Sequence, residues 1–156
     1  MRARGFTLIE LVITVAIVGL LATAAFPLAH MASRRAKEQE LRLALREIRE
    51  AIDAYKIAYD EGRVVQEVGQ TGYPPSLDVL AEGVVDARSP ESRSIYFLRR
   101  VPRDPFFPDR SAPASSTWGL RSYESPPDDP QPGEDVFDVY SLSTDTALSG
   151  VKYRDW

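Results

Sequence analysis

The sequence predicts a fold that combines one long N-terminal helix with a small β-sheet formed later in the chain. A helical pattern runs from Leu8 to about Asp60, and such a helix would be about 80 Å long at 1.5 Å of rise per residue. Two segments of β-branched and aromatic residues, 118–123 and 136–141, indicate strands. The segment 124–135 between them is rich in Pro and acidic residues, which predicts a loop.

The composition excludes several classes of function. With 156 residues the chain is too short for a TIM barrel or a two-domain enzyme. Its formal net charge of −4 argues against a general nucleic-acid binder, which needs a basic surface. The chain has no cysteine, so it can form neither a disulfide nor a thiolate metal site. A single histidine leaves little room for imidazole-based chemistry.

The first half of the predicted helix has the composition of a membrane anchor. Residues 11–29 form a run of nineteen residues without a charge, and about 20 apolar residues cross a bilayer as a helix. A short basic leader, residues 1–5, precedes the run. A cleaved secretory signal is the alternative, because Ala22-Thr23-Ala24 loosely resembles its cleavage site. We favour a retained anchor, because the run leads directly into further helical sequence.

The distribution of positive charge leaves the orientation of this anchor open. The basic residues before the apolar run are Arg2 and Arg4, and those after it are Arg34, Arg35, Lys37, Arg42 and Arg46. By the positive-inside rule this excess would place the C-terminal side in the cytoplasm. If the chain is exported, something other than loop charge decides its topology.

Glu10 is a carboxylate inside the apolar block, between Ile9 and Leu11. At the centre of a membrane helix such a charge costs about 2.5–3.5 kcal/mol, and near the end it costs less but still favours a cationic partner. One interpretation is a residue at the helix end that reaches the interface. The other is an ion pair with a neighbouring chain, because no basic residue within the apolar run of the same chain can serve it.

Residues 5–12, Gly-Phe-Thr-Leu-Ile-Glu-Leu-Val, resemble the leader-peptidase site of type IV prepilins and pseudopilins. The resemblance implies that a membrane prepilin peptidase cleaves between Gly5 and Phe6 on the cytoplasmic face and that Phe6 is then N-methylated. It also implies a periplasmic C-terminal part. The partner of Glu10 would then be the new ammonium at Phe6 of a neighbouring subunit, and a buried pair of this kind enforces register.

Pro27 matches a position where members of this family often carry proline. A proline inside a helix removes the hydrogen bond to the carbonyl four residues earlier, here that of Thr23. The Thr23 hydroxyl could help to satisfy the backbone groups freed in this way. Pro27 then either produces a kink that the helix tolerates or marks the point where the helix loosens when it moves from lipid into a filament.

The outer half of the helix predicts an amphipathic element. Its apolar positions follow spacings of 3 and 4, which is typical of one helix face, and they are Leu41, Leu45, Ile48, Ile52, Tyr55 and Tyr59, widened by Ala44, Ala51 and Ala58. Gly62 is expected to end the helix. Glu38–Arg42 and Arg49–Asp53 have the spacing of ion pairs on the opposite face. A coiled-coil seam is possible, but we favour packing on a sheet of the same chain, because the remaining residues need a core.

The region after the helix predicts a mostly irregular head. A short helix is expected before Gly83, with Ser76 near its N-cap. Prolines 102, 105, 108 and 113 make regular structure unlikely around them. Arg99, Arg100 and Arg103 could bind an anion, although a solvated cluster balanced by Asp104 and Asp109 is the favoured interpretation.

Four segments of the head resemble the major, G-type pseudopilin of type II secretion systems: 73–80, 100–106, 138–142 and 155–156. The resemblance implies an α+β fold with a small antiparallel sheet, and a helical homopolymer in the periplasm that drives export through the outer membrane. It implies a leader at 1–5, a transmembrane and assembly helix at 6–31, an amphipathic periplasmic helix at 32–62 and a head at 63–156. Minor pseudopilins, the prepilin peptidase and an inner-membrane assembly platform would be its partners.

Major pseudopilins usually bind calcium in the loop that follows the segment matching 138–142. Such an ion needs 6–8 oxygen ligands, and here the loop 143–150 supplies one carboxylate, Asp145. We therefore favour a loop closed by its own hydrogen bonds over a calcium site at Asp145.

Two other functions compete with a pseudopilin. A type IV pilin for adhesion, motility or DNA uptake would share the N-terminal motif, although the chain has no C-terminal cysteine pair of the kind that many such pilins carry. A membrane-anchored enzyme is disfavoured, because Asp128 and Asp129 lie in a proline-rich loop and the sequence has neither a phosphate-binding loop nor a serine elbow.

Overall fold

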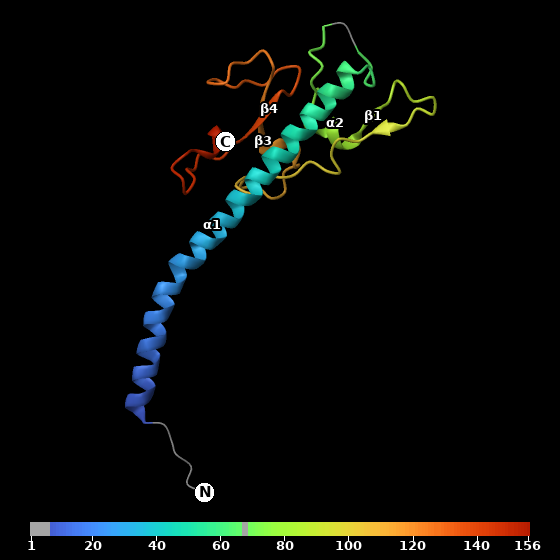
Figure 1. Cartoon of the computed structure of the whole chain (residues 1–156). Helices are drawn as coiled ribbons and strands as arrows, with labels where there is room; N and C mark the ends of the chain where they lie inside the picture. Colours follow the sequence, from blue (N-terminus) through green and yellow to red (C-terminus); the bar gives the residue numbers. More distant parts are fainter. Residues whose placement is uncertain (1–6, 67–68) are drawn as a thin grey trace. The chain divides into compact units, whose positions relative to one another are not determined.

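The computed structural model describes residues 7–66 and 69–156, except for the side chains of residues 24–28 (Figure 1). Two compact units make up the chain, Met1–Lys37 and Glu38–Trp156. The longest element, helix α1, spans Leu8–Asp60 and contributes to both. These bounds confirm the long helix that the sequence predicts.

Helix α1 ends in a Schellman motif. Gly62 has a positive φ of 70°, its N–H donates to the Tyr59 carbonyl, and the Arg63 N–H donates to the Ala58 carbonyl. Arg63, the residue after Gly62, is bound to Asp86, whose carboxylate accepts two hydrogen bonds from the Arg63 guanidinium at 3.1 and 2.8 Å. This guanidinium holds the pKa of Asp86 below its ordinary value. Gly62 therefore ends the helix as the sequence predicts.

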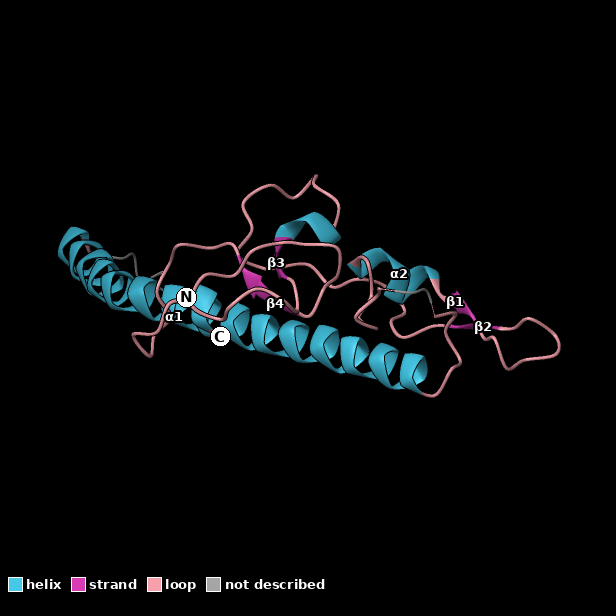
Figure 2. Cartoon of the chain, turned by 90° about the horizontal axis from the view of Figure 1, so that it is seen from above, coloured by secondary structure: helices cyan, strands magenta, loops and turns pink. Residues whose placement is uncertain are grey.

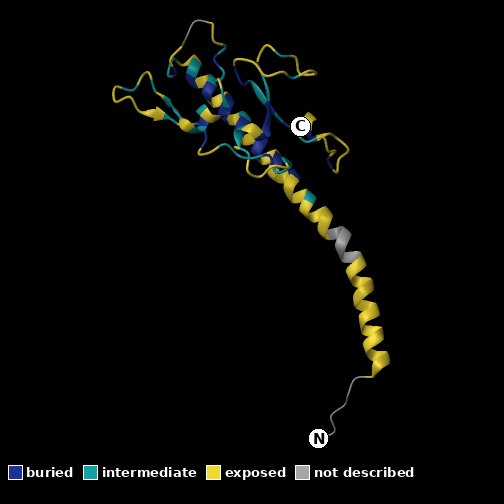
Figure 3. Cartoon of the chain, turned by 180° about the vertical axis from the view of Figure 1, so that it is seen from behind, coloured by how far each residue is buried: buried dark blue, intermediate teal, exposed yellow. Residues whose placement is uncertain are grey.

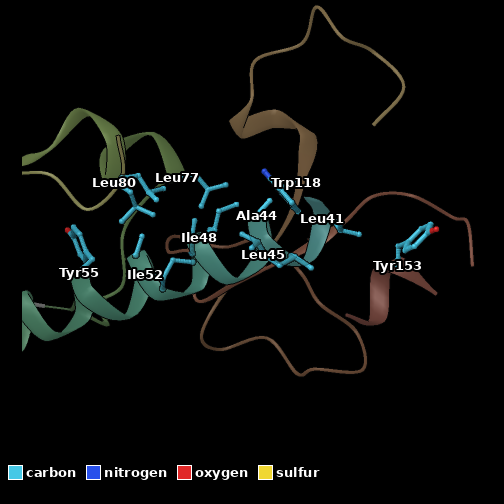
Figure 4. Close-up of a cluster of buried hydrophobic side chains, with 14 of the residues drawn as sticks. Leu41, Ala44, Leu45, Ile48, Ile52, Tyr55, Leu77, Leu80, Trp118 and Tyr153 are labelled. Atoms are coloured by element: carbon cyan, nitrogen blue, oxygen red, sulfur yellow. The ribbon is translucent and has the colours of Figure 1, made fainter. Parts of the chain in front are cut away.

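The predicted apolar stripe of α1 is the centre of the head's core. Leu41 and Ile48 are fully buried, and the side chains of α2, which spans Leu77–Glu82, face the stripe (Figure 4). The core also takes side chains from the strands and the C-terminal segment. Its other members include Leu45, Ile52, Tyr55, Leu77, Leu80, Trp118, Val139 and Tyr153. Packing on the same chain, rather than a coiled-coil seam, thus accounts for this face.

The chain forms two small antiparallel sheets (Figure 2). Strands β1, Val84–Val85, and β2, Ser94–Ile95, form one of them, which lies near the C-terminal end of α1 (Figure 2). Strands β3, Trp118–Arg121, and β4, Asp138–Ser141, form the other, which lies beside α1 (Figure 2), with Gly119 opposite Tyr140. Two 3-10 helices, Ser115–Thr117 and Tyr153–Asp155, complete the elements. The fold is α+β as expected, although the sequence did not predict β1 and β2.

The strands of the larger sheet are shorter than predicted because flanking residues bond elsewhere. Ser122 N–H donates to the Gln131 carbonyl and Tyr123 N–H to the Asp135 carboxylate, so the chain leaves the ladder after Arg121. On the other strand, Val136 N–H donates to the Pro74 carbonyl at 2.8 Å. Both ends of the long acidic loop between β3 and β4 therefore form hydrogen bonds with partners outside the sheet.

The short helix α2 has the predicted place, with Ser76 at its N-cap and Gly83 at its end. Ser76 occupies the N-cap position with an extended backbone, and its side chain makes no capping hydrogen bond. Gly83 closes the helix with a φ of 84°, and its N–H donates to the Val79 carbonyl. The glycine is required here, because a side chain is strained at this φ and a Cβ would also contact the Tyr96 ring.

Candidate processing and assembly surfaces

The start of α1 is capped by Thr7. The Glu10 N–H donates to the Thr7 hydroxyl at 3.3 Å, and the Leu11 N–H donates to the Thr7 carbonyl at 3.2 Å. Thr7 is thus the N-cap, and Glu10 is the third residue of the helix, where the positive end of the helix dipole favours a carboxylate. Thr-x-x-Glu is the sequence pattern of a capping box, a signal that the sequence analysis missed.

The predicted cleavage site lies just before this cap. Gly5 and Phe6 are outside the described residues, so the structure neither supports nor contradicts their roles. What it does show is that regular helix begins at Leu8, two residues after the predicted new N-terminus. The Glu10 side chain is exposed in the single chain.

In the N-terminal part of α1, every residue from 8 to 23 is exposed, as the yellow ribbon in Figure 3 shows, and most of these residues are apolar. Exposed fractions range from 53% for Ile13 and Ile17 to 83% for Leu8, and the other large side chains are Ile9, Leu11, Val12, Val15, Val18, Leu20 and Leu21. A helix that is apolar all round is buried in its working environment, either in lipid or among other helices. Across the described residues, no helix reaches the length and apolarity that a membrane span needs.

The hydroxyls of two threonines in this segment donate to main-chain carbonyls three residues earlier in the helix. Thr14 donates to the Leu11 carbonyl at 2.9 Å, and Thr23 donates to the Leu20 carbonyl at 2.7 Å. Pro27 has no N–H to donate to the Thr23 carbonyl. The Thr23 hydroxyl does not replace that donor, because it donates to Leu20. The assigned helix continues through position 27, while the Pro27 side chain lies outside the described part.

Arg49 connects α1 to β4 and to the C-terminal segment of the head. Its Nε donates to Asp138 Oδ1 at 2.7 Å, and a terminal nitrogen donates to the Val139 carbonyl at 3.1 Å and the Trp156 carbonyl at 2.8 Å. The predicted helical pair with Asp53 is therefore replaced by a pair with a distant strand. Sequence spacing could not show this partner.

The loop after β4 is held by Glu38. Glu38 Oε1 accepts a hydrogen bond from the Leu148 N–H at 2.8 Å and from the Tyr153 hydroxyl at 2.9 Å. Within the loop, the Asp145 carbonyl accepts the Tyr153 N–H, and the Asp145 N–H donates to the Ser143 hydroxyl. Glu38 is a buried residue, and Tyr153 is fully buried.

This loop does not fit a calcium ion. Asp145 is exposed, and its carbonyl oxygen is already an acceptor within the loop. Across residues 7–66 and 69–156 there is no group of three or more acidic or histidine side chains that could hold a metal. A hard cation needs 6–8 oxygens, which Asp145 and its neighbours do not gather.

Of the predicted arginine cluster, Arg103 makes structural hydrogen bonds, whereas Arg99 and Arg100 are exposed. Arg103 donates to the main-chain carbonyls of Ala112 and Asp109. Asp104 is buried and accepts the Ser141 hydroxyl at 2.5 Å and the Phe106 N–H at 2.7 Å. The expectation that Asp104 balances the charge of the surface arginines is therefore wrong. Its carboxylate instead fixes the 102–106 turn against β4.

The acidic residues proposed for an enzyme do not form a prepared site. Asp128 lines a polar cleft of about 320 Å³ together with Asp138, Arg154 and Asp155. The Asp138 carboxylate is engaged by Arg49, and Asp129 accepts hydrogen bonds within its own loop. The described residues that line this cleft include no histidine, serine or lysine to act as nucleophile or base.

The described part of the chain combines a capped, apolar helical stem, which is the N-terminal part of α1, with an α+β head. Residues 1–26 match the prokaryotic N-terminal methylation motif. This motif places the chain in the type IV pilin and pseudopilin superfamily. Comparisons with the curated proteins and with the solved structures found no match.

The motif implies the processing and assembly of a prepilin-like subunit. Prepilin-like proteins are cleaved by a prepilin peptidase and polymerise into a pilus. They are anchored in the inner membrane with a periplasmic head, and pilin-like proteins are structural rather than enzymatic.

Proposed function

We propose that this chain is a subunit of a type II secretion pseudopilus, similar to the major, G-type pseudopilin. In this role it polymerises into a periplasmic fibre that drives export of proteins through the outer membrane. The observation that carries the proposal is the stem, whose apolar side chains are exposed all round and whose first turn holds Glu10. Such a surface requires burial, first in the membrane and then among the stems of other subunits.

The choice of the G-type branch is supported by the segments that resemble it. In the structure these segments form the framework of the head. Pro74, Leu77 and Leu80 lie in the core, Asp104 holds the turn against β4, and Trp156 accepts a hydrogen bond from Arg49 through its carbonyl. Residues in these places are expected to be similar in proteins that share this head.

Within this proposal, the chain matures before it assembles. The peptidase removes residues 1–5, the amine of Phe6 is methylated, and residues 6–31 anchor the protein with the head, 63–156, in the periplasm. During assembly, Glu10 pairs with the Phe6 ammonium of a neighbouring subunit, and Pro27 allows the stem to adjust as it leaves lipid. Calcium has no place in this proposal, because the loop around Asp145 does not gather its ligands.

The test is the intact mass and N-terminal chemistry of the protein isolated from its native membrane. We expect a chain that begins at a methylated Phe6, together with a fibre that can be recovered from the periplasm. Replacement of Gly5 by leucine should block cleavage, because the peptidase must close on a small residue there. A chain that keeps residues 1–5 and stays monomeric in its own host would overturn the proposal.

A type IV pilus is the other candidate, since the N-terminal motif is common to both systems. Neighbouring genes separate the two. An outer-membrane secretin with an export ATPase and further pseudopilins would support the pseudopilus, whereas a retraction ATPase would support a pilus for adhesion, motility or DNA uptake.

A further inference from the structure

Outside the core, helix α1 lines a groove with a charged face whose N-terminal part, at Arg42 and Arg46, is basic. The groove has a volume of about 550 Å³ and lies between α1 and the C-terminal segment. Arg42, Arg46 and Arg49 line it from the helix together with Glu50 and Asp53 further along, and Val151 and Trp156 line it from the opposite side. The Arg42 guanidinium lies 4.3 Å from the centroid of the Trp156 ring, so the part of the groove at Arg42 and Arg46 combines positive charge with apolar surface.

A second exposed face of the same helix has the complementary chemistry. Glu40, Leu43 and Glu47 follow one another at spacings of three and four, which places them on one side of a helix. All three are exposed, and Leu43 keeps 64% of its surface accessible although it is a large apolar residue. This face therefore has an apolar centre between two carboxylates.

Four charged side chains of these two faces form no ion pair within residues 7–66 and 69–156. Among the described residues, no ion pair involves Arg42, Arg46, Glu40 or Glu47. By contrast, Arg49 on the neighbouring turn is paired with Asp138. The free charges are thus available to a partner of opposite sign.

The two faces are separated by roughly 110° around the helix, at 100° per residue. A contact in which one face of a copy meets a different face of the next copy is heterologous, and it leaves both ends of the assembly open to further copies. Two complementary but distinct faces therefore favour a growing filament over a closed dimer.

We propose that the groove binds the Glu40–Leu43–Glu47 face of a second copy of this chain. Leu43 of the incoming copy packs on Val151 and Trp156, and the carboxylates of Glu40 and Glu47 face Arg42 and Arg46 of the groove. The charges fix register and exclude wrong partners more than they add affinity. This inference rests on the proposed polymerisation, and it adds which surfaces of two copies meet.

Cross-linking of the full-length protein in its host membrane tests this contact. The chain has no cysteine, so introduced thiols are the only ones present. A chain with both Leu43→Cys and Val151→Cys, treated with a short thiol-reactive cross-linker, should give a ladder of multimers. A chain with Leu43→Cys and Tyr96→Cys is the matched control, because Tyr96 is exposed at 65% but lies outside the groove. We expect at least a tenfold higher yield of multimers than in the control.

A charge exchange provides the second measurement. Arg46→Glu alone and Glu47→Arg alone should each lower the fibre yield at least fivefold, and the chain with both exchanges should recover most of it. Both residues are exposed, so these variants keep their core.

The outcomes separate this inference from the proposed function. Cleaved chains that form normal fibres without cross-links above the control, and without sensitivity to the charge exchange, overturn the contact and leave the polymer intact. Failure of the unaltered chain to polymerise overturns both.

Discussion

Arg49 and Asp138 are 89 positions apart in the sequence, yet Arg49 Nε lies 2.7 Å from Asp138 Oδ1. The same guanidinium also donates to the carbonyls of Val139 and Trp156. The planar fork of arginine suits such a set of acceptors, which a lysine ammonium cannot reach together. One side chain of α1 thus fixes both the edge of β4 and the C-terminal segment.

Removal of the Arg49 guanidinium should destabilise the head. Charge-assisted hydrogen bonds contribute about 1.5–3 kcal/mol when they are well shielded, and the partial exposure of this pair reduces that value. We expect Arg49→Leu to lower the free energy of unfolding by about 1–2 kcal/mol, and Arg49→Lys to recover less than half of the loss. Denaturant unfolding of the detergent-solubilised chain measures both. Arg46→Leu is the matched control on the next turn, and an equal loss in that variant would show that the Arg49 contacts contribute nothing specific.

Glu38 should be required for the order of the loop 143–150. Glu38→Ala leaves the Tyr153 hydroxyl and the Leu148 N–H without their acceptor, which costs about 1–3 kcal/mol for buried groups. The expected result is faster proteolysis within the loop and a lower unfolding midpoint. Tyr153→Phe removes only one of the two hydrogen bonds and should have a smaller effect. Unchanged proteolysis in Glu38→Ala would show that the loop is ordered by other contacts.

Calcium should not affect the stability of the head. The loop around Asp145 is closed by Glu38 and by its own main chain, and the described residues gather no cation ligands there. Thermal unfolding in excess calcium and in excess chelator should therefore give the same midpoint. A rise of several degrees with calcium, abolished by Asp145→Ala, would show that the loop rearranges to bind the ion.

The ion pair of Arg63 and Asp86 should make stability depend on pH in the acidic range. The guanidinium lowers the pKa of Asp86 from its ordinary value of 3.8, so the folded state holds this carboxylate charged more strongly than the unfolded state does. The contribution is fully present above pH 3.8 and is lost as the pH falls through the lowered pKa of the folded state. Unfolding of the wild type and of Asp86→Asn should therefore differ at neutral pH and converge in acid. A difference that persists at the lowest pH would assign the effect to packing.

Gly119 should tolerate no larger residue. It pairs with Tyr140 across β3 and β4, and a Cβ at position 119 would overlap the Tyr140 ring. Gly119→Ala should cost about 1–3 kcal/mol, because the ring must leave its place in a packed sheet. Denaturant unfolding of Gly119→Ala and of Gly119→Ala with Tyr140→Ala measures this cost. If the second substitution gives no relief, the glycine is needed for another reason.

The parts of the fold that could be predicted are those set by local sequence. The buried stripe of α1 and its end at Gly62 follow from helical periodicity and from the conformation that glycine allows. The Thr7 cap is also a feature of local sequence, since Thr-x-x-Glu is the pattern of a capping box. By contrast, the partners of Arg49 and Glu38 lie 89 to 115 positions away, and spacing carries no information on them. The two-residue strands β1 and β2 are too short for any period to be visible.

The role of Glu10 provides the most direct test of assembly. Its carboxylate lies in the first turn of α1, exposed in the single chain and without a basic residue in the apolar run around it. In a bundle of stems it would be surrounded by apolar side chains, where an unpaired charge is costly and a paired one sets register. Glu10→Ala should therefore leave membrane insertion and cleavage at Phe6 unchanged and reduce the fibre yield by at least tenfold.

Two measurements on the same sample separate maturation from assembly in this variant. The intact mass reports cleavage and methylation, and the sheared fibre fraction reports polymerisation. Glu10→Gln keeps the size and the hydrogen-bonding oxygen but not the charge, so it should fail like Glu10→Ala if the pair is ionic. If Glu10→Gln forms fibres at the wild-type level, the residue acts as a hydrogen-bond acceptor, and register must come from the contacts between the heads.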